Sequence, residues 1–426
     1  MNALIDDLAW RGLIAQSTDL DALRRDLDDG ALTFYIGFDP TAPSLHLGNL
    51  LQIITMMRFQ SQGHLPLALV GGATGLIGDP KMTGERTLNP VDVVEEWGSR
   101  LRRELERFFD FEGPAAARMV NNYDWTRDVD VISFLRDVGK HFSVNRMLDR
   151  EAVAARLAGD GISFTEFSYQ LLQSYDYLEL FRRYGCTLQM GGSDQWGNIT
   201  AGVDLIRRSE AAHVHALTTP LVTKADGTKF GKTESGTVWL DPQMTSPYAF
   251  FQFWLNADDR DIAGYLRLYS RKDRAEIEAL ETLTVEEPAR REAQRALARE
   301  LTTLVHGEHA TEAVEAAAAA LFGQGDLDDV PEDALGAALR EVPHAQLSRD
   351  DVADGALPDA VELFTRTGLA PSRGAARRTI GEGGAYVNNA RVEDEGFRPG
   401  LRDLLHGRYL VLRRGRKTVA GVILAE

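Results

Sequence analysis

The sequence has little of several residue types that mark particular protein classes. It contains one cysteine, Cys186, which excludes an internal disulfide framework and a zinc site built from several cysteines. Its nine histidines lack the spacing of metal ligands, so we expect no metal site in the chain. No stretch is apolar enough to cross a bilayer, and the acidic N-terminus lacks the features of a signal peptide. These absences predict a cytoplasmic protein in a reducing compartment, with no membrane partner.

Lysine is also scarce. Only seven of the 47 basic residues are lysines, and three of these lie between positions 224 and 232, in LVTKADGTKFGKTESG. A solvated turn with incidental lysines is one interpretation. The bias toward arginine elsewhere favours another, a loop that needs compact, flexible ammonium groups for a ligand. A P-loop is excluded, because Gly227 and Gly231 are separated by three residues rather than four and no strand-to-helix pattern surrounds them.

The length and charge of the chain indicate several domains. A chain of 426 residues with 44% hydrophobic content can bury more than one core. The net charge of −17 argues against sequence-independent binding of nucleic acid, which needs a positive field. The charge is uneven, however, because residues 371–426 carry 11 basic and 6 acidic residues. A small basic module therefore follows an acidic body.

The order of strand-like and helix-like stretches predicts an α/β fold. LTFYIGF and LPLALVGG resemble buried strands, and the helical stretch LHLGNLLQIITMMRFQ lies between them. This alternation is typical of a doubly wound parallel sheet, a Rossmann-like arrangement. Residues 326–359 hold ten acidic residues against two basic ones, which favours a linker. We predict a Rossmann-like domain over 1–244, a helical domain over 245–325, an acidic linker over 326–357 and a small α+β domain over 358–426.

Three glycine-rich, polar loops follow predicted strands: FDPTAPSLHLGN, VGGATGLIGDP and MGGSDQWGN. Ligands of parallel sheets bind at the carboxyl ends of strands, where loops and helix N-termini offer backbone donors. One such loop is ordinary turn chemistry, but three together favour a nucleotide site. The candidate residues in these loops are Asp39, Thr41, His46 and Gly48, then Asp79, and then Gly192, Asp194 and Gln195.

A predicted helix, EFSYQLLQSYDYLELF, carries a polar stripe. Tyr169, Gln173 and Asp176 are spaced i, i+4 and i+7, so they share one helix face. The face could simply meet water. A phenol, an amide and a carboxylate on one face could equally hold a small polar ligand such as an amino acid.

Five motifs in order resemble the bacterial type of tyrosyl-tRNA synthetase, a class I aminoacyl-tRNA synthetase family. His46-Leu47-Gly48-Asn49 resembles the HIGH motif of that class, and Lys229-Phe230-Gly231-Lys232-Thr233 resembles its KMSKS motif. The resemblance covers roughly the first 320 residues. The basic tail GLAPSRGAARRTIGEGGAYVNNARV is similar to a small RNA-binding module shared with a ribosomal protein. The motifs are YIGFDPTAPSLHLGN, GGATGLIGDP, FTEFSYQLLQSYDY, QMGGSDQWGNIT and LVTKADGTKFGKT.

The resemblance implies ATP-dependent activation of L-tyrosine, release of pyrophosphate, and transfer of the tyrosyl group to the 3′ end of tRNA(Tyr). It implies ATP as a substrate with Mg²⁺, no tightly bound cofactor, and a homodimer formed through the segment around residues 125–160. Tryptophanyl-tRNA synthetase, or another nucleotidyltransferase of the superfamily, is the alternative among enzymes. An RNA-binding protein that keeps the scaffold without catalysis is the alternative from another class.

The resemblance also implies roles for individual residues. Asn49 replaces the second histidine of HIGH, and Lys81 and Arg86 lie in a short version of a mobile phosphate-contacting loop in which the alignment of Lys81 is ambiguous. The expected phosphate-contacting, catalytic residues are Thr41, His46, Arg86, Lys229 and Lys232. The expected tyrosine site is Tyr35, Asp79, Tyr169, Gln173, Asp176 and Gln195. The expected ATP site is Asp39, Gly48, Asn49, Gly192, Asp194, Lys232 and Thr233, and the expected RNA contacts are Arg377, Arg378, Arg413, Arg414 and Lys417.

Overall fold

The computed structural model describes residues 3–81, 84–159, 161–225, 228, 230–233, 236–415 and 418–425. The chain divides into two compact units. The first unit comprises Met1–Asp241 and Asp258–Glu286, and the second comprises Pro242–Ala257 and Glu287–Glu426. Among the described residues, no helix has the length and apolarity needed to span a bilayer.

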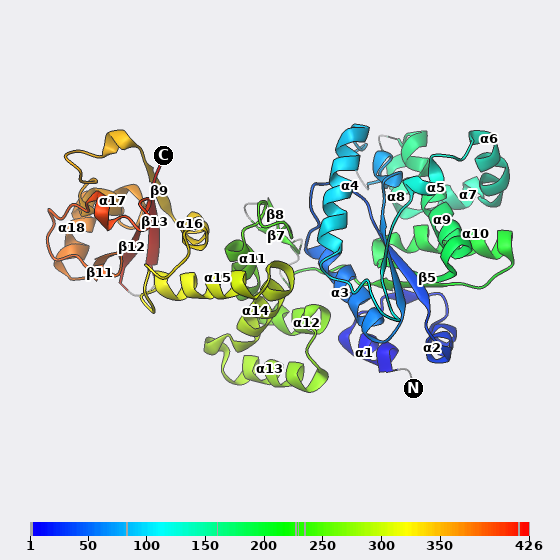
Figure 1. Cartoon of the computed structure of the whole chain (residues 1–426), viewed down its shortest axis with the longest axis horizontal. Helices are drawn as coiled ribbons and strands as arrows, with labels where there is room; N and C mark the ends of the chain where they lie inside the picture. The colour runs from blue at the N-terminus through cyan, green and yellow to red at the C-terminus, as the bar shows by residue number, and fades with distance from the viewer. Residues whose placement is uncertain are drawn as a thin grey trace. The chain divides into compact units, whose positions relative to one another are not determined.

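A six-stranded, mostly parallel sheet forms the centre of the first unit (Figure 1). Its strands lie in the order β1-β6-β5-β2-β3-β4, and only the edge strand β1 runs antiparallel to its neighbour. This arrangement confirms the predicted doubly wound fold. The strands are β1 (Gln16–Ser17), β2 (Thr33–Phe38), β3 (Leu65–Val70), β4 (Arg118–Asn121), β5 (Cys186–Gly192) and β6 (His215–Thr219).

Helices cover both faces of this sheet, with α4 on one side and α9 and α10 on the other (Figure 1). The central strand β2 is therefore apolar along nearly its whole length, and Phe34, Tyr35, Ile36 and Phe38 are all buried. The helices of the first unit are α1 (Ala3–Arg11), α2 (Leu20–Asp29), α3 (Leu47–Ser61), α4 (Val91–Leu105), α5 (Tyr123–Thr126), α6 (Val131–Ser133), α7 (Val144–Leu148), α8 (Glu151–Leu157), α9 (Phe164–Tyr184), α10 (Trp196–Glu210), α12 (Asp259–Tyr269) and α13 (Arg274–Glu286).

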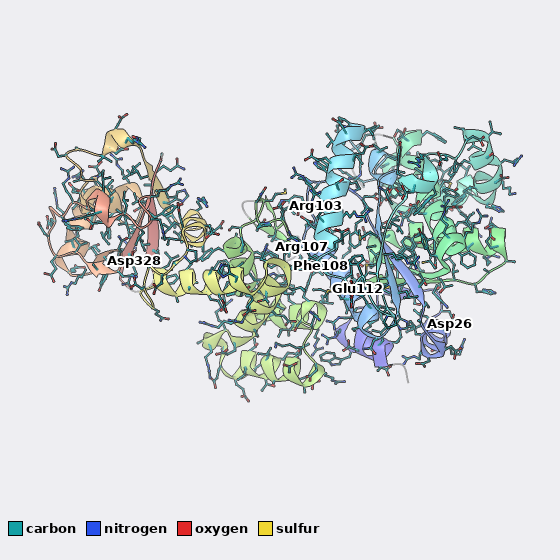
Figure 2. The ribbon with its side chains drawn as sticks, viewed as in Figure 1. Asp26, Arg103, Arg107, Phe108, Glu112 and Asp328 are labelled. Atoms are coloured by element: carbon teal, nitrogen blue, oxygen red, sulfur yellow. The ribbon has the colours of Figure 1, made fainter. Side chains whose placement is uncertain are left out.

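The chain order of the strands creates a switch point beside β2. From β2 the chain adds β3 and β4 on one side, and it later adds β5 and β6 on the other side. The loops that follow β2 and β5 therefore diverge, which leaves a crevice at the carboxyl ends of these strands. Away from this crevice, His215 Nε2 on β6 lies 2.6 Å from Oδ2 of Asp26 on α2, which Figure 2 labels.

Two helices that we expected in a separate helical domain pack with the first unit. The buried guanidinium of Arg11, on α1, donates to the backbone oxygens of Arg267, Ser270 and Lys272. These acceptors lie on or just after α12. Burying a guanidinium is favourable only when its donors are paired, so this contact fixes α12 to the first unit.

The second unit combines helices with a five-stranded sheet in the order β11-β10-β12-β13-β9. Asn388 and Asn389 have positive φ angles of 46° and 64°, and they connect β10 to β11 in a hairpin. The helices are α11 (Pro247–Leu255), α14 (Glu292–His306), α15 (Glu308–Leu321), α16 (Glu332–Arg340), α17 (Ala360–Arg366) and α18 (Arg373–Gly381). The strands are β9 (His344–Leu347), β10 (Ala385–Val387), β11 (Ala390–Arg391), β12 (Tyr409–Arg414) and β13 (Thr418–Leu424).

The segment expected to be an acidic linker is folded into this unit. It contains α16 and β9, and β9 pairs in parallel with β13 at the edge of the sheet. Leu335 and Leu339 of α16 are fully buried. The acidic residues and prolines therefore occupy the surface and turns of a packed segment rather than an open connection.

Gly336→Ala should destabilise the second unit, because a Cβ at this position on α16 would lie 2.5 Å from the buried hydroxyl of Tyr409. We expect a loss of about 1–3 kcal/mol in the free energy of unfolding, measured by denaturant titration. Gly381→Ala is the matched control, since no atom lies within 4 Å of its Cβ position. Equal stability of the two variants would contradict the packing of α16 on the sheet.

Candidate active site

A cavity of about 370 Å³ opens at the carboxyl ends of β2, β3 and β5 in the first unit. It unites the three loops and the polar face of α9 that the sequence singled out separately. Neither the rule for the carboxyl ends of strands nor the helical spacing of the polar stripe could show that these parts meet, because α9 is distant in sequence from the first two loops. The expected residues that line the cavity are Tyr35, Asp39, Thr41, His46, Gly48, Asn49, Asp79, Arg86, Tyr169, Gln173, Asp176, Gly192, Asp194 and Gln195.

One end of the cavity is built around the buried carboxyl group of Asp176. Asn122 Nδ2 and Trp125 Nε1 each donate to it over 2.9 Å. Burial nevertheless raises the pKa of Asp176 to about 8, which these two hydrogen bonds only partly offset. The hydroxyl of Tyr35 is also buried and has no hydrogen-bond partner among the described residues. A buried hydroxyl beside a carboxyl group suits a ligand that carries a hydroxyl of its own.

A continuous chain of hydrogen bonds runs from Asp176 to Asp39. Asn122 Nδ2 also donates to Thr74 Oγ1 over 2.9 Å, and Thr74 Oγ1 donates to Asp39 over 2.7 Å. The hydroxyl of Tyr169 donates to the other oxygen of Asp39 over 2.6 Å. Burial raises the pKa of Asp39. A Cβ at Gly71 would overlap the Asp39 carboxylate, so this arrangement requires glycine there.

Asp79 forms a second anchored carboxylate in the cavity. It accepts hydrogen bonds from Gln195 Nε2 over 2.8 Å and from Asn198 Nδ2 over 3.1 Å. Arg150 in turn donates to Asn198 Oδ1 over 2.6 Å. Burial raises the pKa of Asp79, while these amides and the charge of Arg150 act in the opposite direction. Together with Asp39, this carboxylate makes the middle of the cavity a suitable site for an ammonium group.

His46 precedes α3 at the other end of the cavity, and the helix cap that it forms sets the tautomer of its ring. Its Nδ1 accepts hydrogen bonds from the backbone amides of Gly48 and Asn49, while Asn49 Oδ1 accepts from the backbone amide of His46. The neutral ring must then carry its hydrogen on Nε2. A Cβ at Gly48 would lie 3.0 Å from the His46 ring, so the glycine also makes room for this cap. The result is a hydrogen-bond donor at a helix N-terminus, which suits a phosphate.

The stretch around Phe230 lies against the start of α3. The Phe230 ring lies 5.0 Å from the ring of Tyr265 and 5.6 Å from that of Tyr269, whose hydroxyl donates to the backbone oxygen of Leu47. A Cβ at Gly231 would lie 3.5 Å from Leu47. The described part of the KMSKS-like motif therefore packs against the start of α3, which carries the HIGH-like motif. Lys232 and Thr233 form β7 (Lys232–Thr233), which pairs with β8 (Gly236–Thr237), and Lys229 lies outside the described residues.

Other expected residues lie away from the cavity. Lys81 is exposed and is not among the residues that line it. In the second unit, Arg377, Arg378 and Arg414 are exposed, whereas Lys417 lies outside the described residues. Arg413 stacks over the Tyr386 ring at 4.5 Å and donates to the backbone oxygen of Phe322, so its side chain already has structural contacts.

Several residues that shape the cavity were missed in the sequence. Asn122 follows β4, so the rule for the carboxyl ends of strands could have identified it. Thr74 and Asn198 lie in two of the glycine-rich loops but were not chosen as candidates, and nothing local marked Trp125. The importance of all three comes from contacts with residues far along the chain. Gln189, on β5, lines the cavity and its side-chain oxygen is buried without a partner among the described residues.

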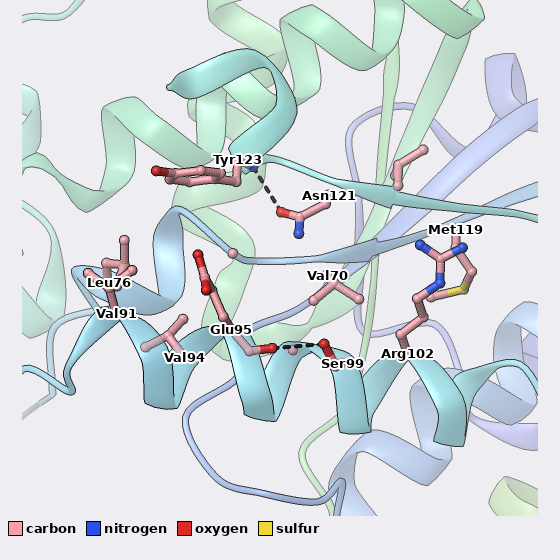
Figure 3. A pocket seen from close by; sticks show the side chains of 13 residues that line it. Val70, Leu76, Val91, Val94, Glu95, Ser99, Arg102, Met119, Asn121 and Tyr123 are labelled. Atoms are coloured by element: carbon pink, nitrogen blue, oxygen red, sulfur yellow. Dashed lines mark hydrogen bonds between the residues drawn. The ribbon is translucent and has the colours of Figure 1, made fainter. Parts of the chain in front are cut away.

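A second cavity, of about 350 Å³, lies between α4 and β4 (Figure 3). Its wall mixes aliphatic side chains, such as Val70 and Val94, with polar ones, such as Glu95, Ser99 and Arg102. Asn121 lines it and accepts a hydrogen bond from the backbone amide of Tyr123. It lacks the converging carboxylates of the first cavity. In the described part of the chain, no group of three histidine, cysteine or acidic residues is arranged to hold a metal ion.

Comparisons with known proteins agree with this geometry. A family model described as class I tRNA synthetases (W and Y) matches residues 27–323, and one for the tyrosine–tRNA ligase SYY-like C-terminal domain matches residues 335–421. The chain is 63% identical over 424 residues to a tyrosine–tRNA ligase of Streptomyces avermitilis, covering 99% of both chains. It is 62% identical over 434 residues to that of Thermobifida fusca, covering 100% of both.

Solved structures also resemble the chain. A C-terminally truncated mitochondrial tyrosyl-tRNA synthetase from Coccidioides posadasii has a TM-score of 0.65 and 29% identity, covering 74% of this chain and 91% of its own. The corresponding Aspergillus nidulans protein has a TM-score of 0.67 and 30% identity, covering 74% and 92%. A tryptophanyl-tRNA synthetase from Plasmodium falciparum, at 13% identity and a TM-score of 0.53, covers 72% of this chain and 84% of its own and shares the fold.

Asp176→Asn should alter how stability depends on pH. The folded-state pKa of about 8 lies far above the unfolded value of about 4, so ionising Asp176 opposes folding. Its stabilising contribution is complete below about pH 4 and is lost as the pH rises toward 8. From about pH 5 to about pH 7, the ligand-free wild type should lose about 1.4 kcal/mol per pH unit relative to the variant. Denaturant unfolding of both proteins measures this difference, and a difference independent of pH would contradict the ionisation penalty.

Proposed function

Since this chain belongs to the family of class I tRNA synthetases for tryptophan and tyrosine, we propose that it is a ligase that charges tRNA with L-tyrosine. ATP activates tyrosine to tyrosyl-adenylate with release of pyrophosphate, and the tyrosyl group is then transferred to the 3′ end of tRNA(Tyr) for translation. The observation that carries the choice of tyrosine is the buried pair formed by the Asp176 carboxyl group and the Tyr35 hydroxyl at one end of the cavity.

The phenolic hydroxyl of tyrosine can satisfy both members of that pair. It donates to or accepts from Asp176 according to the protonation of the carboxyl group, and it also hydrogen-bonds Tyr35. Phenylalanine would leave the Tyr35 hydroxyl buried without a partner, which costs about 1–3 kcal/mol, and would give Asp176 nothing beyond its bonds from Asn122 and Trp125. Tryptophan has a larger, bicyclic ring, and its N–H group lies at a different position and can only donate. The pair therefore favours a phenol over an indole.

The α-ammonium group of tyrosine binds at the middle of the cavity. Asp79 and Gln173 face it, and Tyr169 is held for this contact by its hydrogen bond to Asp39. Gln195 lies at the tyrosine carboxylate. That carboxylate is itself the nucleophile that attacks the α-phosphate, so the chain needs no nucleophile of its own. Its contribution is positioning and the stabilisation of charge that moves toward pyrophosphate.

ATP binds at the other end of the cavity, with Mg²⁺ carried on its phosphates. His46 donates from Nε2, and Thr41 and Arg86 add donors to the phosphates. Lys229 and Lys232 close on the β- and γ-phosphates in the transition state, which gives the scarce lysines their function. Residues at the nucleoside and the adenylate linkage are Asp39, Gly48, Asn49, Gly192, Asp194 and Thr233.

The protein works as a homodimer in the cytoplasm, where translation takes place. Six large apolar side chains between residues 131 and 157, within the segment expected at the dimer contact, are exposed among the described residues, which supports a contact between two copies. Their exposed fractions are 71% for Val131, 71% for Ile132, 51% for Leu135, 58% for Val144, 36% for Leu148 and 49% for Leu157.

Amino-acid-dependent exchange of pyrophosphate into ATP tests the activation step. Wild type should exchange with tyrosine and far less with phenylalanine or tryptophan. Tyr35→Phe should narrow the preference for tyrosine over phenylalanine by about 10- to 100-fold, because the unpaired hydroxyl is removed. Tyr177→Phe is the matched control, since its buried hydroxyl bonds the backbone oxygen of His215 outside the cavity. No exchange with tyrosine would overturn the proposed function.

Arg378→Ala combined with Arg414→Ala should weaken binding of tRNA, because both exposed arginines are proposed to bind phosphates. The slope of log affinity against log salt should fall by about one for each arginine–phosphate interaction that is removed. Filter binding of tRNA at several salt concentrations measures this slope. Tyrosine-dependent pyrophosphate exchange should be unchanged. Arg340→Ala, which removes an exposed arginine of the same unit, should change neither. An unaltered salt slope in the double variant would contradict these interactions.

A further inference from the structure

A buried ion pair lies next to the cavity but does not line it. Arg156 Nη1 lies 2.9 Å from Glu166 Oε2, and their side chains are only 4% and 1% exposed. Arg156 is on α8 and Glu166 is in the first turn of α9, the helix that carries the polar stripe. Burying two charges is costly, so a pair of this kind needs further contacts to be favourable.

The further contacts of this ion pair are hydrogen bonds to the backbone of neighbouring loops. Glu166 Oε1 accepts a hydrogen bond from the backbone amide of Arg86 over 2.7 Å. Arg156 donates to the backbone oxygens of Gly84, over 2.6 Å, and Gly161, over 2.9 Å. The pair thus fixes the described end of the segment that connects Asp79 to Arg86 against the start of α9.

The side chain of Arg86 is oriented from this anchored backbone. Its Nε donates to the backbone oxygen of Asp79 over 2.5 Å, and its guanidinium lines the cavity. The side chain passes over Gly78, where a Cβ would lie 2.5 Å from Arg86 Cδ. Two points, the amide held by Glu166 and the Nε held by Asp79, therefore determine where the rest of the guanidinium points.

We propose that Glu166 and Arg156 are positioning residues for the ATP half of the reaction. Glu166 holds the backbone of Arg86 and Arg156 holds that of Gly84, so that the Arg86 guanidinium meets the phosphates. Glu166 does so from α9, the helix that supplies Tyr169, Gln173 and Asp176 to tyrosine. One rigid element then sets the distance between the amino acid and the phosphates. This inference rests on the proposed function.

Glu166→Gln is the informative variant. The amide keeps one oxygen for the Arg86 amide, but its NH₂ group faces the Arg156 guanidinium, a donor against a donor. In the full-length protein, pyrophosphate exchange should lose about 10- to 100-fold in kcat/KM for ATP. The Kd for tyrosine, measured without ATP by equilibrium dialysis, should change less than about twofold.

Further variants complete the experiment. Glu210→Gln removes the carboxylate of another ion pair, at 2.6 Å from Arg182, and should leave exchange unchanged. In an Arg86→Ala background, Glu166→Gln should have little further effect, because its influence passes through Arg86. If Glu166→Gln does not fold, Arg156→Met combined with Glu166→Leu removes the charges at similar volume and should show the same selective loss.

The outcomes separate the two hypotheses. An equal loss of tyrosine affinity and exchange, or a full loss that persists in the Arg86→Ala background, would overturn the positioning role while the proposed function stands. Pyrophosphate exchange by Glu166→Gln at the wild-type rate would also overturn the positioning role. Absence of tyrosine-dependent exchange in wild type would instead remove the proposed function and this inference with it.

Discussion

The burial of the Asp176 carboxyl group is the constraint on which the rest of the site depends. A carboxyl group in this environment needs donors, and Asn122 and Trp125 supply them. Asn122 uses its remaining N–H on Thr74 and its oxygen on the backbone amide of Ala73, so all of its hydrogen-bonding groups are engaged. Satisfying one buried acid thus orders the loop after β3 and, through Thr74, the carboxylate of Asp39.

This chain of contacts divides the cavity into regions of different chemistry. At one end lie the Asp176 carboxyl group and the Tyr35 phenol, which suit a hydroxyl. In the middle lie two carboxylates, which suit a cation, and at the other end lie a helix N-terminus and His46, which suit phosphate groups. Under the proposed function, tyrosine and ATP bind in the one orientation that matches this order. Rate enhancement then follows from alignment rather than from covalent chemistry.

The sequence predicted more of the first unit than of the second. LTFYIGF and LPLALVGG became β2 and β3 because buried parallel strands are apolar along their length. The loops after these strands lie where the rule for parallel sheets puts them. Trp125 could not be recognised, because only the folded chain brings it to Asp176. The segment predicted as a linker contains β9. This strand could not be recognised from the sequence, because its pairing with β13 depends on residues far along the chain. The division between the units likewise depends on contacts such as those of Arg11.

A crystal structure with bound L-tyrosine tests the central claim most directly. We expect the phenolic oxygen within about 2.5–3.0 Å of both the Asp176 carboxyl group and the Tyr35 hydroxyl, with the ammonium group beside Asp79. The positions of Asn122 and Trp125 should not change, because their hydrogen bonds to Asp176 exist before the ligand binds. Tyrosine bound in the reverse orientation, or with its hydroxyl away from Asp176, would contradict the claim.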